Sequence, residues 1–172
     1  MNPVVLKYGI MAGVSTVVYL LLFYFIQKPL FLDAKVLWST LIIYLFFMFK
    51  AVNEIDDIAT SIDFKSYIQI AFWVFVIADL IYYPFFHILC NYLDTSLLEL
   101  MRSTQSEYLE LTLKQSTRIE EQQVIRKTIE ELKTQDMHIT FSNTLYSLVQ
   151  GIIGGFLLSV IVAMITSKRN EG

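Results

Sequence analysis

Four long apolar stretches alternate with short polar segments along the chain. They run over about residues 4–26, 36–51, 66–87 and 144–166. A helix needs about 20 apolar residues to cross the hydrocarbon core of a bilayer. None of the stretches alternates with the period of two that is typical of a strand, and only helices or closed barrels satisfy the backbone in lipid. The pattern therefore predicts an all-α membrane protein with four transmembrane helices.

The first two stretches depart from the simplest pattern of a membrane span. The first lies at the N-terminus, where secretory signal peptides also occur. The apolar run of a signal peptide is shorter than this stretch, about 7–15 residues, so we interpret the stretch as a retained transmembrane helix. The second is short, and it is bounded by Lys35 and Lys50. The aliphatic stems of these lysines let the ammonium groups reach the headgroup region.

A polar segment of about residues 91–138 separates the third stretch from the fourth, and it contains neither Gly nor Pro. Residues of good helix propensity dominate it, and apolar residues recur at helical spacing on either side of Ser116. Because the chain must return to the bilayer to begin the last span, we expect an extramembrane helical hairpin. Its thin apolar stripe is a candidate surface for docking a partner; the alternative is a solvated hairpin that only links two spans. The stripe consists of Leu97, Met101, Tyr108, Leu111, Ile125, Ile129 and Leu132.

Composition agrees with one membrane domain over residues 1–172. Hydrophobic residues make up 55% of the chain and charged residues only 17%, below the roughly 25% of a soluble domain. The net charge of -3 does not favour nucleic acid as a partner, and the single cysteine excludes an internal disulfide. No nucleophile–base constellation or phosphate-binding loop is present, so we expect no enzyme activity and no cofactor.

The positive residues close to the spans indicate the orientation. Four spans place both termini on one side, and positive residues near span ends favour the cytoplasm. Lys28 and Lys35 lie on the opposite side. The residues on the side of the termini are Lys7, Lys50, Lys65, Lys168 and Arg169. We therefore expect cytoplasmic termini and a hairpin that faces outward.

Asp79 is the acid inside a predicted span, in the third stretch. An intramembrane carboxylate is costly, so it suggests a function by default. Gln150 lies at a similar depth in the fourth stretch, and an Asp79–Gln150 hydrogen bond is the structural interpretation. The functional alternative is proton or cation handling by Asp79 together with Tyr82 and Tyr83.

Small residues mark two of the spans. Gly9 and Gly13 are four residues apart in the first span, and Gly151 and Gly155 are four apart in the last. Such pairs let helix backbones approach closely. We interpret them as the packing seam between the first and fourth spans; a homodimer or partner contact is the alternative.

Two further groups of polar residues lie outside the spans. His87 and Cys90 follow the third span, Asp136 and His138 come just before the fourth, and such side chains bind zinc. Their spacing has no paired-cysteine motif, so we expect no metal site there. The acidic loop over residues 53–65 lacks the spacing of an EF-hand, and we expect a solvated turn.

Three segments together resemble a known membrane family. They are Leu6 to Gly13 at the start of the first span, Ser61 to Tyr67 before the third, and a Glu-, Gln- and Lys-rich insertion before a last span that ends in Lys168 and Arg169. They resemble the bacterial family catalogued as domain of unknown function 4199, found mainly in Bacteroidetes. The resemblance implies four spans in a Gram-negative inner membrane, and hence a periplasmic hairpin. It implies no catalytic residue, and it places a membrane glycosyltransferase first among the partners to test.

These observations favour a non-catalytic accessory or scaffold subunit of an inner-membrane complex. Its hairpin docks a membrane-protein partner, or the protein associates with a second copy of itself. The alternative is a small proton- or cation-coupled transporter or channel that uses Asp79.

Overall fold

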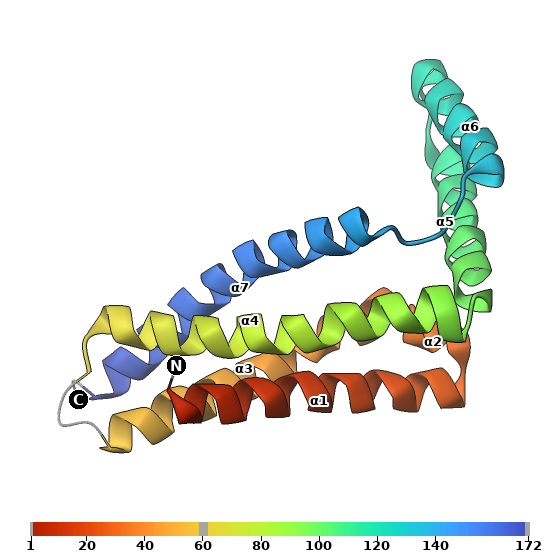
Figure 1. Cartoon of the computed structure of the whole chain (residues 1–172). Helices are drawn as coiled ribbons and strands as arrows, with labels where there is room; N and C mark the ends of the chain where they lie inside the picture. The colour runs from red at the N-terminus through yellow and green to blue at the C-terminus, as the bar shows by residue number, and fades with distance from the viewer. Residues whose placement is uncertain (1, 59–61, 171–172) are drawn as a thin grey trace. The chain divides into compact units, whose positions relative to one another are not determined.

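All the elements of the computed structural model are helices (Figure 1). It describes residues 2–58 and 62–170, with side chains through Ser167. Ser61, named in the sequence analysis, therefore lies outside the described residues. The side chains of Lys168 and Arg169 lie outside the described side chains. The elements are α1 (Pro3–Ile26), α2 (Lys28–Phe31), α3 (Ala34–Ile58), α4 (Phe64–Ile88), the π-helix η1 (Leu89–Leu93), α5 (Ser96–Gln115), α6 (Ile119–Thr134) and α7 (Phe141–Asn170).

Four of these helices are long and apolar enough to cross a membrane. The four segments are Pro3–Ile26, Ala34–Ile58, Phe64–Leu93 and Phe141–Ser167. This confirms the prediction of an all-helical chain with four such segments. Each segment extends beyond the range drawn from hydropathy; in the second, a mostly polar stretch after Ala51 continues the helix to Ile58.

The chain divides into two compact units, one of residues 87–140 and one that holds the rest. In the larger unit, α1, α3, α4 and α7 share one apolar core. Ala12 of α1, Met48 of α3, Val74 of α4 and Val162 of α7 are completely buried in it. The core therefore draws residues from each of the four long helices.

The glycine pairs of the first and last long helices both face α4. A Cβ built on Gly9 lies 2.6 Å from Cβ of Ile77, and one built on Gly13 lies 2.8 Å from Cβ of Ile81. On α7, a Cβ at Gly155 overlaps the ring of Phe75. The predicted seam between the first and fourth spans is therefore replaced by two seams against the third. The sequence identifies the small residues that permit close approach of two helices, but it does not show which helix packs against them.

The acidic segment expected as a solvated turn is helical as far as Ile58, and its residues 59–61 lie outside the described residues. α3 continues to Ile58, and Glu54 accepts hydrogen bonds from Lys7 Nζ at 2.9 Å and from Tyr8 Oη at 2.5 Å. Asp56 accepts a bond from Tyr67 Oη at 2.6 Å. These contacts join the start of α1 and the start of α4 to the end of α3, so the three helix ends lie at one end of the bundle.

The smaller unit is a pair of helices, α5 and α6, with its two chain ends held together. Arg102 of α5 donates to the carbonyl of Gln135, just after α6, at 2.7 Å. Asn91 of η1 bonds both backbone groups of Ile139, donating to O at 2.7 Å and accepting from N at 3.0 Å. An Asn side chain that bonds an N–H and a C=O of the same residue imitates a strand pairing. The two ends of the unit therefore lie close together.

Candidate functional site

Asp79 of α4 is the buried acid of the membrane helices and the centre of the candidate site. Its residue surface is only 4% exposed. Tyr44 of α3, itself 3% exposed, donates from Oη to Asp79 Oδ1 over 3.0 Å. The ring of Tyr44 packs against Phe75 with centroids 4.9 Å apart. The acid is thus held between two helices by one hydrogen bond, which an aromatic contact supports.

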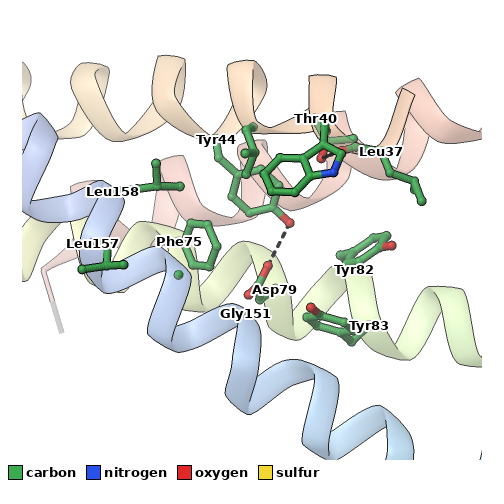
Figure 2. Close-up of a pocket in the computed structure, with 13 residues that line it drawn as sticks. Leu37, Thr40, Tyr44, Phe75, Asp79, Tyr82, Tyr83, Gly151, Leu157 and Leu158 are labelled. Carbon is green, nitrogen blue, oxygen red and sulfur yellow. Dashed lines mark hydrogen bonds between the residues drawn. The ribbon is translucent and has the colours of Figure 1, made fainter. Parts of the chain in front are cut away.

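A cavity of about 410 Å³ opens beside this pair, between α3, α4 and α7 (Figure 2). Its walls are mostly aromatic and aliphatic, with Asp79 as the acidic group. The lining residues are Leu37, Trp38, Thr40, Leu41, Tyr44, Phe75, Asp79, Tyr82, Tyr83, Gly151, Gly154, Leu157 and Leu158. Small-molecule sites in proteins have this character, an apolar pocket with few polar groups.

The second oxygen of Asp79 has no hydrogen-bond partner among the described residues. Oδ2 is buried, and it lies close to Gly151 of α7, where a built Cβ would sit 2.7 Å from it. The same Cβ would sit 2.9 Å from Tyr83 Oη. Of the described residues lining the cavity, none is Lys, Arg or His. An ionised Asp79 would therefore lack a counter-charge from the cavity walls.

The structure does not form the expected bond between Asp79 and Gln150. Gln150 is exposed on α7, and Tyr44 supplies the donor instead. Sequence reasoning missed Tyr44 because tyrosines in spans usually mark the membrane interface. The signal that identifies it is its position near the middle of α3, where an interface residue has no place. Tyr82 and Tyr83, expected beside the acid, do line the cavity.

The seven residues of the expected docking stripe divide into three classes. Leu97, Ile129 and Leu132 are buried, so they are unavailable to a partner. Met101 and Ile125 are half-buried. Tyr108 and Leu111 are 68% and 51% exposed. A thin stripe serves first to hold two helices together, and only its remainder faces outward.

The four weak metal candidates have other contacts. His87 lies beside Asn91, whose Nδ2 is 3.4 Å from each ring nitrogen, and Cys90 is buried. Asp136 Oδ1 accepts a bond from the backbone N–H of His138 at 2.9 Å. Within the part of the chain that the structure describes, no three His, Cys, Asp or Glu residues gather as a metal site.

Comparison with known proteins gives one match. A family model described as protein of unknown function (DUF4199) matches residues 7–168, nearly the whole chain. No curated protein and no solved structure matches it.

Proposed function

The chain belongs to the DUF4199 family of proteins of unknown function, and we propose that it is a non-catalytic accessory or scaffold subunit of a bacterial inner-membrane complex. The α5/α6 pair forms an extramembrane hairpin in the periplasm and docks a partner protein there. The observation that carries the proposal is a set of large apolar side chains that the pair leaves exposed near its turn.

Two of these side chains lie on each helix of the pair. Tyr108 and Leu111 of α5 are 68% and 51% exposed, and Ile119 and Val124 of α6 are 74% and 66% exposed. They lie in the halves of the helices next to the turn over residues 116–118. If water surrounds the pair, their burial by a partner contributes about 25 cal/mol for each Å² removed from solvent. Exposed apolar groups of this kind often mark an interaction surface.

The charged residues at the ends of the long helices support cytoplasmic termini. Lys7 lies at the start of α1 and pairs with Glu54 at the end of α3, and Lys65 opens α4. Lys28 and Lys35 lie at the connection between α1 and α3. Lys50, Lys168 and Arg169 follow in sequence near the same end as the termini, which gives five positive residues there against two at the other end. The positive-inside rule then favours the end with the termini as cytoplasmic. Alkaline phosphatase inserted after Thr117 should be active, and green fluorescent protein at the C-terminus should fluoresce. The reverse pattern would overturn the orientation.

A photo-crosslinking residue in place of Leu111 tests the docking proposal. It should give one specific adduct in living cells, and a membrane glycosyltransferase is the first candidate to identify by antibody or mass spectrometry. Tyr108→Ser with a crosslinker at 111 should reduce the adduct, because both side chains belong to the exposed set. Glu107→Ser, a neighbouring exposed change, is the matched control. An adduct pattern unaffected by Tyr108→Ser, or no adduct at all, would contradict docking through this surface.

A second candidate function is proton- or cation-coupled transport through Asp79. The buried Oδ2, which has no donor among the residues that the structure describes, favours it, because a carboxylate in a membrane interior needs a proton or a cation to offset its charge. Purified protein in proteoliposomes should then conduct protons or monovalent cations, and Asp79→Asn should abolish the flux. Equal flux through wild-type, Asp79→Asn and empty vesicles would refute it.

A further inference from the structure

The cavity beside Asp79 has aromatic and aliphatic walls, and its described lining residues supply no counter-charge to the acid. We propose that it binds a lipophilic organic cation, whose charge pairs with Asp79 and whose apolar body lies against the walls. The proposal rests on the second candidate function above, in which Asp79 handles a cation, and it names the chemical class of the ligand.

The charge of the ligand follows from the surroundings of the carboxylate. Oδ1 has a single neutral donor, Tyr44, and Oδ2 has none among the described residues. The lysine nearest the N-terminus, Lys7, is already paired with Glu54. Removing an anion from water without a partner costs many kcal/mol, far more than one hydrogen bond returns. A cationic ligand supplies the missing charge, whereas an anionic one would add a second buried negative charge.

The walls fit a cation that is itself apolar. Aromatic faces attract cations through their negative π-surface, most strongly where water is excluded. Five aromatic residues line the cavity: Trp38, Tyr44, Phe75, Tyr82 and Tyr83. Four leucines also line it, namely Leu37, Leu41, Leu157 and Leu158. The volume of about 410 Å³ lies in the range of about 300–1,000 Å³ for drug-sized ligands.

Two glycines of α7 line the cavity and differ in how much room lies beside them. A Cβ on Gly151 would come within 2.7 Å of Asp79 Oδ2 and 2.9 Å of Tyr83 Oη. A Cβ on Gly154 would meet nothing within 4 Å. Gly151 therefore lets α7 approach the carboxylate closely, and a methyl group at this position would fill the space beside Asp79 Oδ2.

Equilibrium binding of tritiated tetraphenylphosphonium to the full chain in detergent micelles or nanodiscs tests the proposal. This probe carries its charge at every pH and has an aromatic, apolar body. Wild type should bind it saturably with one site per chain. Triphenylphosphine oxide, a neutral analogue, should not compete at the same concentration. Absence of saturable binding to wild type would overturn the proposal.

Two comparisons place the probe beside the acid. Asp79→Asn keeps the shape of the side chain but removes the charge, and it should weaken binding by about tenfold or more, equivalent to about 1.4 kcal/mol. Gly151→Ala should weaken binding more than Val149→Ala, a change at an exposed position of the same helix that does not line the cavity. If Asp79→Asn fails to fold, this pair of variants alone decides. Equal affinity in Gly151→Ala and Val149→Ala, or in wild type and folded Asp79→Asn, would refute a site at Asp79.

The binding and flux measurements fail separately. Saturable binding that depends on Asp79 but comes with no flux would remove the transport function and leave the site. Flux that depends on Asp79, with no binding of the probe, would remove this ligand class and leave transport by Asp79.

Discussion

Gly155→Ala should destabilise the bundle, although alanine is the better helix former. A Cβ at this position overlaps the ring of Phe75, with Cγ only 2.6 Å away. Phe75 is 5% exposed and packs on Tyr44, which in turn bonds Asp79. A shift of the ring that relieves this overlap would disturb its contact with Tyr44. Overpacking of this kind costs about 1–3 kcal/mol.

Gly154→Ala is the control for the helix term. It makes the same chemical change one residue away on the same helix, with nothing within 4 Å of the new methyl group. It should be neutral or stabilise by up to about 1 kcal/mol, the difference in helix propensity between Gly and Ala. The two variants should therefore differ in stability by at least about 1 kcal/mol, a few degrees in Tm for a chain of this size.

Thermal unfolding in mild detergent, followed by far-ultraviolet circular dichroism, measures this difference. Adding Phe75→Leu to Gly155→Ala should recover part of the lost stability, because the smaller leucine side chain leaves room for the alanine methyl group. A Tm for Gly155→Ala equal to or above that of Gly154→Ala would refute the packing of α7 on α4 described above.

Three further predictions follow from polar contacts outside the cavity. Asn91→Leu should remove both bonds to Ile139, at a cost of about 1 kcal/mol or more, and hydrogen exchange at the Ile139 amide should accelerate; unchanged exchange would contradict it. Glu54→Gln should lower Tm at low salt but less at high salt, because it removes a partly exposed ion pair; Asp57→Asn, at an exposed position, should not. Hydrogen bonds from Ser66 in the first turn of α4 lower the pKa of Asp63. A lowered folded-state pKa stabilises the fold above the unfolded value and loses this effect as the pH falls through the folded value. Asp63→Asn should therefore show a smaller drop in Tm than wild type between about pH 6 and pH 3; an identical drop would count against this role of Asp63.

The number and class of the long helices could be predicted from the sequence because transfer from water to lipid depends on composition over about 20 residues. The partners of those helices could not. Lipid solvates a leucine as well as a neighbouring helix does, so contacts in a membrane depend on shape. Gly9 and Gly155 were recognised as close-approach positions, but only the structure shows Ile77 and Phe75 of the same helix filling both.

The polar residues, too, could be predicted only in part from the sequence. Asp79 was identified as the costly residue from its place in the third span, yet its donor comes from α3 rather than α7. Depth along the membrane normal can be estimated from sequence, and it placed Gln150 near Asp79. Rotation about each helix axis decides which of two residues at one depth faces the acid, and hydropathy leaves that rotation undetermined. The position of Tyr44 in mid-span is visible in the sequence, but its bond to Asp79 is found only when the helices are packed.

The bonds between Asn91 and Ile139 have a consequence for how this chain tolerates change. These bonds hold the two ends of the smaller unit together. A change in the length of the chain between Asn91 and Ile139 therefore leaves the distance between these two residues unchanged. The entropic cost of closing such a segment grows only slowly with its length. Adding or removing the same number of turns in α5 and α6 should then be tolerated. The length and the exposed surface of the helix pair can vary while the bonds between Asn91 and Ile139 stay the same.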